Sequence, residues 1–180
     1  MKKVCCINMR ALFFYLLLIM IFSVAACSES SQEVVELKRF PLDSLDGIIT
    51  QTGIEFDKEI SSDRKGSLRI TAAEPTVIRL FEISDINVEN ARLLYQAKVR
   101  TKNIQGQVFL EMWCHFPGKG EFFSRSLQSP LSGTTEWTSI ETPFFFKKGQ
   151  KPDLVKLNLV INGNGTAWID DIHLIKGPLQ

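Results

Sequence analysis

Residues 106–116 have the sequence GQVFLEMWCHF, in which apolar and mixed positions alternate one by one. Neighbouring side chains of a β-strand point to opposite faces of the sheet. The segment therefore predicts a strand with one apolar and one mixed face. The apolar face would hold Val108, Leu110, Met112, Cys114 and Phe116, and the mixed face Phe109, Glu111, Trp113 and His115.

The same alternation occurs in residues 91–101 and 153–162. Strands with one apolar and one polar face are typical of antiparallel sheets that pack face to face with their outer faces wet. No stretch has a convincing helical period, and Gly, Pro, Asn and Asp separate the segments. We therefore predict an all-β fold, an antiparallel two-sheet β-sandwich (jelly roll). The remaining predicted strands are 47–51, 54–60, 67–72, 76–84, 120–128, 135–146 and 165–176.

The N-terminus has the organisation of a secretory signal. Basic residues occur at positions 2, 3 and 10, residues 11–22 are apolar, and small residues precede Cys27. A charged start, an apolar middle and a small-residue cleavage site define such a signal. The alternative is an uncleaved membrane anchor, although residues 11–26 are shorter than the ~20 apolar residues that a spanning helix needs.

The segment Val24-Ala25-Ala26-Cys27 resembles the lipobox of bacterial lipoproteins. This resemblance implies lipid on the Cys27 sulfur, cleavage before Cys27 and acylation of the new N-terminus. The chain would divide into a signal peptide (1–26), a lipidated Cys with its tether (27–44) and a domain (45–178). The protein would be anchored in the bacterial cell envelope. Ser28 stands where an inner-membrane retention signal has Asp, which resembles outer-membrane sorting in a Gram-negative cell.

Composition limits the classes of partner. Without residues 1–26 the chain has 154 residues, with 18 basic and 20 acidic side chains. No basic block remains, which argues against a nucleic-acid partner. Cys114 would be the only cysteine besides Cys27, so the mature domain has no internal disulfide and depends on its apolar core.

The closing segment GNGTAWIDDIHL (163–174) resembles the last strand of carbohydrate-binding-module-like jelly rolls, the galactose-binding-domain-like fold. Residues 91–100 and 155–161 also resemble strands of those domains. The resemblance covers roughly residues 45–176 and implies a jelly-roll sandwich. This fold hosts sugar binding, protein binding and scaffolding, so it does not by itself decide the function.

The mixed face of residues 106–116 is the first candidate site. A sugar site needs an aromatic plate and planar polar groups, and Trp113 could supply the plate. If strands pair as they do in the similar domains, polar groups from other strands join this face. The alternative is that residues 117–133 cover it, so that Trp113 and Phe109 form a second core. The predicted ligand-binding residues are Trp113, Glu111, His115, Lys98, Asn158 and Arg125.

The hairpin segment 116–123 is the second candidate. Phe122 and Phe123 cannot both point inward on one strand, so one of them could contact a ligand or partner. The alternative is a plain hairpin with one Phe leaning on a neighbouring loop.

Asp170 and Asp171 form the third candidate, with Glu55 as a partner. Many related jelly rolls hold a structural calcium where the first and last strands meet, and calcium needs several oxygen ligands. The alternative is that the two aspartates only shape a bend or bond to the backbone. We expect no other cofactor.

No motif of a nucleophile, metal protease or hydrolase occurs in the sequence. The sequence therefore predicts a non-enzymatic, membrane-anchored envelope protein. Its partner would be a carbohydrate or similar polar ligand. The alternative is a protein-interaction or structural lipoprotein.

Overall fold

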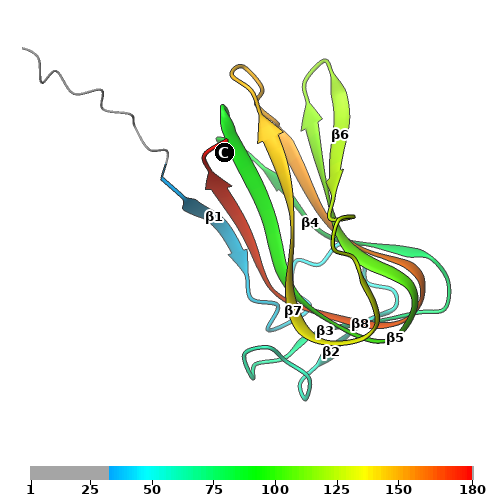
Figure 1. The fold of residues 1–180 in the computed structure, drawn as a ribbon. Helices are drawn as coiled ribbons and strands as arrows, with labels where there is room; N and C mark the ends of the chain where they lie inside the picture. The colour runs from blue at the N-terminus through cyan, green and yellow to red at the C-terminus, as the bar shows by residue number, and fades with distance from the viewer. Residues whose placement is uncertain (1–32, 180) are drawn as a thin grey trace, which may run out of the picture. The chain divides into compact units, whose positions relative to one another are not determined.

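The computed structural model describes residues 33–179, and these form an all-β domain without a helix (Figure 1). No helix in this range is long and apolar enough to cross a membrane. The strands are β1 (Val35–Phe40), β2 (Ile54–Asp57), β3 (Ser67–Ala72), β4 (Thr76–Ser84), β5 (Ala91–Phe116), β6 (Gly120–Arg125), β7 (Leu131–Phe146) and β8 (Leu154–Gly177).

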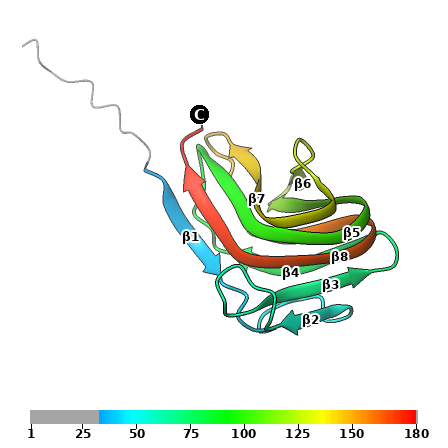
Figure 2. The same cartoon turned by 60° about the horizontal axis from the view of Figure 1, so that its bottom comes forward.

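The strands form one antiparallel hydrogen-bonded sheet that folds over into two layers (Figure 2). Layer A contains β4, the first half of β8, the second half of β5, and β6. Layer B contains β7, the first half of β5 and the second half of β8, with β3 and β1 on the far edge of β8 and β2 beside β3. The predicted β-sandwich is confirmed.

β5 and β8 pass through both layers because each bends at a glycine. Gly106 and Gly163 lie opposite each other in the β5–β8 register, and both have positive φ. A Cβ at Gly106 would collide with the carbonyl oxygen of Asn162, and one at Gly163 with that of Gln105. Four strands predicted from the sequence are therefore two. Residues 91–101 and 106–116 are both part of β5, and residues 153–162 and 165–176 are both part of β8.

The core lies between the two layers. Leu110, Met112 and Cys114 of β5 are fully buried in layer A, and Leu93 and Tyr95 of the same strand are fully buried in layer B. These residues have the parity that the sequence analysis assigned to the core. The predicted burial of Cys114 is confirmed.

Two segments differ from the prediction. Residues 35–40, assigned to the tether, form β1, which pairs with residues 172–176 of β8, so the folded domain begins before residue 45. β1 carries mostly exposed, charged side chains and therefore lacks the apolar alternation of a core strand. Residues 47–51 form no strand and only follow β4 through two backbone hydrogen bonds. Cys27 and the predicted signal lie outside the described residues.

Candidate ligand-binding site

The outer face of layer A carries a polar cluster centred on Glu111 of β5. In the strand register, Glu111 lies between Arg125 of β6 and Asn158 of β8. Its Oε1 accepts hydrogen bonds from Trp113 Nε1 at 2.7 Å and Asn158 Nδ2 at 3.0 Å. Its Oε2 accepts one from Arg125 Nε at 2.6 Å. Three of the six predicted ligand-binding residues therefore converge on the carboxylate of a fourth, Glu111.

The electrostatics of this cluster make Glu111 an organiser of the face. Burial alone would raise the pKa of the Glu111 carboxyl, but the hydrogen bonds from Trp113, Asn158 and Arg125 outweigh burial and lower it. Glu111 is only 3% exposed. A charged, buried carboxylate with its oxygens engaged holds its neighbours in place rather than contacting a ligand.

Phe123 is the exposed aromatic ring of this face. It lies opposite Trp113 in the β5–β6 register, and the two ring centroids are 4.9 Å apart. The Arg125 guanidinium carbon lies 4.4 Å from the centroid of the Phe123 ring. Trp113 is half-buried, whereas Phe123 is 51% exposed. Phe123, which contacts Trp113 and Arg125, is therefore the more accessible of the two rings.

His115 and Lys98 do not join the cluster. His115 lies on the same face, but its Nδ1 pairs with Asp153 Oδ1 at 2.6 Å. Lys98 lies in the first half of β5, opposite Ser139 and Asp170, and therefore in layer B. The sequence analysis placed Lys98 beside Trp113, but the bend of β5 puts the two on different layers.

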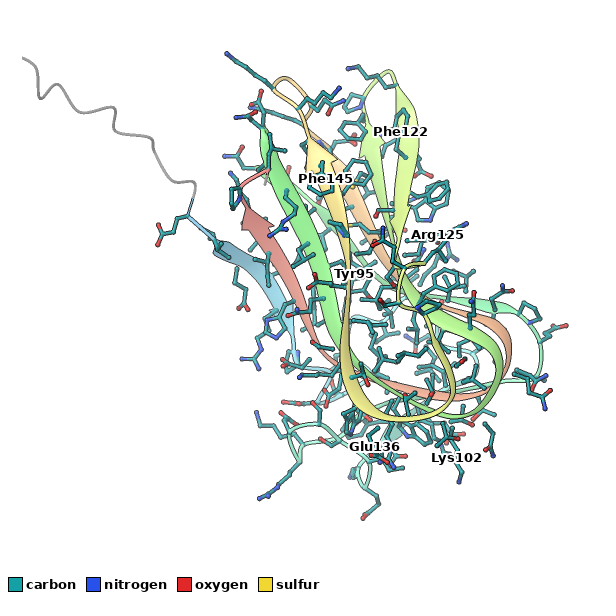
Figure 3. The ribbon with its side chains drawn as sticks, viewed as in Figure 1. Tyr95, Lys102, Phe122, Arg125, Glu136 and Phe145 are labelled. Carbon is teal, nitrogen blue, oxygen red and sulfur yellow. The ribbon has the colours of Figure 1, made fainter. Side chains whose placement is uncertain are left out.

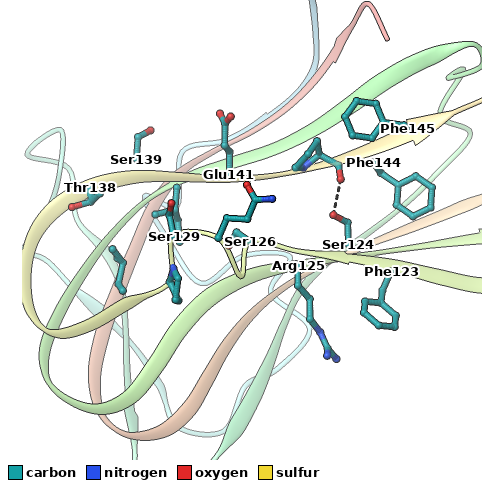
Figure 4. A pocket seen from close by; sticks show the side chains of 15 residues that line it. Phe123, Ser124, Arg125, Ser126, Ser129, Thr138, Ser139, Glu141, Phe144 and Phe145 are labelled. Atoms are coloured by element: carbon teal, nitrogen blue, oxygen red, sulfur yellow. Dashed lines mark hydrogen bonds between the residues drawn. The ribbon is translucent and has the colours of Figure 1, made fainter. Parts of the chain in front are cut away.

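A cleft of about 960 Å³ adjoins the cluster where the free edges of β6 and β7 approach each other (Figure 4). Ser124 Oγ of β6 donates to the Pro143 carbonyl oxygen of β7 at 2.6 Å and lies 2.7 Å from Thr142 Oγ1. The lining residues are Phe123, Ser124, Arg125, Ser126, Gln128, Ser129, Pro130, Leu131, Thr138, Ser139, Ile140, Glu141, Pro143, Phe144 and Phe145.

Phe123 and Arg125 belong to both the cleft and the Glu111 cluster, so the two form one continuous site. The cleft residues that lie outside β6 were not predicted from the sequence. Gln128, in the connection between β6 and β7, and Glu141, in β7, are two of them. Glu141 lies on the outward parity of β7 and accepts a hydrogen bond from Gln96 Nε2 at 3.1 Å. The alternation of side chains in β7 is enough to predict that Glu141 faces outward. That Glu141 comes near β6 follows only from how the sheet folds over into two layers.

The three residues predicted to bind calcium have separate protein partners. Buried Asp170 accepts hydrogen bonds from the backbone N–H groups of Ser62 and Asp171. Asp171 pairs with Arg39 at 2.8 Å, and Glu55 pairs with Arg69. Within residues 33–179 no three His, Cys, Asp or Glu side chains are grouped as metal ligands. The oxygens of all three side chains are engaged by protein partners, and calcium binding by them stays a prediction.

No protein-family model matches this sequence, and no curated protein sequence does either. Solved structures do match its fold. The CBM22-1 xylan-binding domain of Paenibacillus barcinonensis Xyn10C is 12% identical, with a TM-score of 0.57 over 82% of this chain and 97% of that one. The tandem CBM22-1-CBM22-2 domain of the same protein is 11% identical, with a TM-score of 0.60 over 84% of this chain and 48% of that one.

The CBM22-1-GH10 modules of the Clostridium thermocellum xylanase Xyn10B, solved with xylohexaose, are 10% identical, with a TM-score of 0.56 over 79% of this chain and 28% of that one. Identities this low establish the architecture alone. The chain thus has the β-sandwich fold found in carbohydrate-binding modules.

Proposed function

We propose that this protein is a lipid-anchored, non-enzymatic cell-envelope protein that binds a carbohydrate in the cleft between β6 and β7. The observation that carries this proposal is the exposed Phe123 ring, which lines the cleft and is positioned by contacts with the Trp113 ring and the Arg125 guanidinium. A rigid aromatic plate beside a concave, polar-lined surface is what the apolar C–H face of a sugar ring requires.

The charges of the cleft favour a neutral glycan. Arg125, the only cationic residue in the lining, is already paired with Glu111, and the Glu141 carboxylate, whose hydrogen bond comes from the neutral amide of Gln96, would repel an anionic sugar. The other polar lining groups are hydroxyls and the amide of Gln128, which exchange hydrogen bonds with sugar hydroxyls without a net charge. The likeness in fold to domains described as xylan-binding supports a polysaccharide ligand.

The test is calorimetric titration of the purified protein with neutral oligosaccharides chosen from a glycan array. Phe123→Ala should reduce affinity at least roughly tenfold, since a stacked aromatic is worth ~0.5–1.5 kcal/mol beyond its buried area. Val77→Ala is the matched control, because Val77 is similarly exposed but lies outside the cleft. Absence of binding to every neutral glycan, or equal affinity in the Phe123→Ala variant, would contradict the proposal.

A second candidate function is binding of an envelope protein at the same site. β6 and β7 each pair only with β5, so each has a free edge beside the cleft. Free edges accept an added strand from another chain. Pro143 interrupts the edge of β7, because proline has no N–H to offer. A purified partner that cross-links to Ser139 and is not displaced by oligosaccharides would favour this alternative.

A further inference from the structure

Both ends of the described domain lie at the same end of the sandwich. Val35 at the start of β1 pairs with Lys176 near the end of β8, and Arg92 pairs with Gly177. The loops between β4 and β5, β5 and β6, and β7 and β8 are there too, tied by hydrogen bonds from Gly149 N to Glu89 and from Asp153 N to His115 O. Figure 1 shows the chain entering and leaving at this end. We call it the terminal end: residues 33–35, 85–90, 117–122, 145–153 and 176–179.

The terminal end concentrates exposed apolar side chains. Half of the ten exposed large hydrophobic residues found within residues 33–179 lie there, each 40–64% exposed: Val34, Val35, Phe122, Phe145 and Leu179. Figure 3 shows Phe122 and Phe145 at this end and Lys102 at the opposite end. The Val34 side chain and the Arg92 guanidinium both lie beside Gly177: each is 3.8 Å from the point where a Cβ would stand on that glycine. An apolar group and a cationic group therefore border the same glycine.

Lysines surround these apolar groups. Lys119, Lys147 and Lys148 are exposed, and none has an ion pair among the described residues. The acidic side chains Glu89, Glu121 and Asp153 are each paired, with Lys151, Lys156 and His115 respectively. The terminal end as a whole holds five lysines and five acidic residues, but the two loops that carry Phe122 and Phe145, residues 117–122 and 145–153, hold four lysines and only two acidic residues.

The described chain begins at this surface, with residues 33–35. Seven residues, 28–34, separate Cys27 from β1. Fully extended, they span at most ~25 Å. If Cys27 is lipidated, as the proposed function includes, the terminal end is held within that distance of the bilayer.

We propose that the terminal end docks on an anionic lipid surface. Phe122, Phe145 and Val34 would enter the interface, and the lysines would contact the headgroups. Apolar and aromatic side chains flanked by lysine are the combination that binds membrane interfaces. The bend at Gly106 and Gly163 then faces away from the membrane, and the β6–β7 cleft opens to the side.

The test is a lysine footprint of the full chain reconstituted into vesicles. A membrane-impermeant amine reagent modifies the protein, and mass spectrometry gives the rate at each lysine. One vesicle preparation is an equimolar mixture of phosphatidylglycerol and phosphatidylcholine, and the other is phosphatidylcholine alone. In the anionic vesicles we expect Lys119, Lys147 and Lys148 to react at least roughly fivefold more slowly, with Lys102 unchanged, and high salt to reverse most of the difference.

A matched pair of charge reversals sharpens the footprint. Lys148→Glu should lower the protection of Lys119 roughly fivefold or more, and Lys102→Glu, also exposed, should leave it unchanged. Equal protection in both vesicle types, or equal effects of the two variants, would overturn the proposal.

The footprint separates this proposal from the lipid anchor. An uncleaved chain would be held to the vesicle by residues 11–26, and a processed chain by its acyl chains, so the footprint can be measured on either form. The mass of the N-terminal peptide tells which form is present.

Discussion

Arg125 Nε and Glu111 Oε2 lie 2.6 Å apart, and the arginine side chain is 37% exposed whereas the glutamate side chain is 4% exposed. The pair therefore connects the surface of β6 to the interior of layer A. Because Phe123 stacks under the same guanidinium, the buried carboxylate also sets the position of the exposed ring. An ion pair beneath a binding surface of this kind couples stability to ligand recognition.

Glu111→Ala should lower the free energy of unfolding by ~2–3 kcal/mol, because it leaves the buried Asn158 amide without its acceptor, whereas the Arg125 side chain, 37% exposed, stays in contact with water. Glu111→Gln keeps the shape and should cost less, ~1–2 kcal/mol. Urea unfolding measures both. The control is Glu136→Gln, which removes an exposed ion pair with Arg100 and should change stability by no more than ~1 kcal/mol. Equal costs for Glu111→Gln and Glu136→Gln would show that the cluster is not a buried unit.

The same carboxylate predicts a pH dependence. The folded-state pKa of Glu111 is lowered, so its contribution is complete above the unfolded value of ~4.3 and is lost as pH falls through the folded pKa. Glu111→Gln should therefore flatten the fall in stability below about pH 4.3. Melting temperatures of both proteins from neutral pH to pH 3 would check this, and parallel curves would contradict it.

Trp113 and Phe123 should separate stability from binding. Trp113→Phe removes the indole donor to Glu111 and should cost ~1–2 kcal/mol of stability. Phe123→Ala should cost less stability but most of the glycan affinity, because the ring is half-exposed. Leu157→Ala, fully buried, sets the scale of a core change at ~2–5 kcal/mol. The melting temperature and the glycan affinity of each variant are measured together. A loss of stability in Phe123→Ala as large as that in Leu157→Ala would show that Phe123 is a core residue.

Cys114 should be inert in the folded protein. Burial raises the pKa of its thiol to about 12, and the side chain is fully buried. A thiolate is the reactive form, so a thiol reagent should modify Cys114 only as fast as the domain unfolds. Modification kinetics with increasing urea measure this. Rapid labelling of the native domain would contradict the assigned register of β5.

His173 should make the attachment of β1 sensitive to alkali. Burial opposes its charge, but hydrogen bonds with Glu36 of β1 and Asp171 outweigh burial and raise its pKa. Its contribution is therefore complete below the unfolded value of ~6.5 and is lost as pH rises through the folded pKa. Hydrogen exchange of β1 should accelerate across this window beyond the intrinsic increase. The matched variant is His173→Gln, in which the extra acceleration should disappear.

Cys27→Ser should abolish lipidation. The basis is the Val24-Ala25-Ala26-Cys27 segment, whose resemblance to a lipobox makes the Cys27 sulfur the proposed acceptor of the lipid. Metabolic labelling with an acyl precursor should mark the wild-type protein and not the variant. Cys114→Ser is the control and should label normally, and equal labelling of Cys27→Ser would remove the anchor from the proposed function.

The alternation of side chains was enough to predict the sandwich and much of the site. It put Cys114 in the core and Glu111, Trp113 and Asn158 on the mixed faces of their strands, because a strand has only two faces, whereas Arg125 was expected near them only from the strand pairing of similar domains. It could not show that Lys98 lies on the other layer, because that follows from the bend at Gly106. It also missed β1, whose pairing with β8 depends on backbone hydrogen bonds rather than on an apolar face.

The central position of β8 has a consequence for the order of folding. β8 supplies 24 residues at the C-terminus and pairs with β1, β3, β4 and β5, so neither layer is complete until it arrives. During synthesis the earlier strands emerge without their common neighbour, and the long-range pairing that joins them is intrinsically slow. A domain whose two layers stay open until β8 has been made would fit the export that the proposed lipid anchor requires, because an unfolded chain can cross a membrane as a thread.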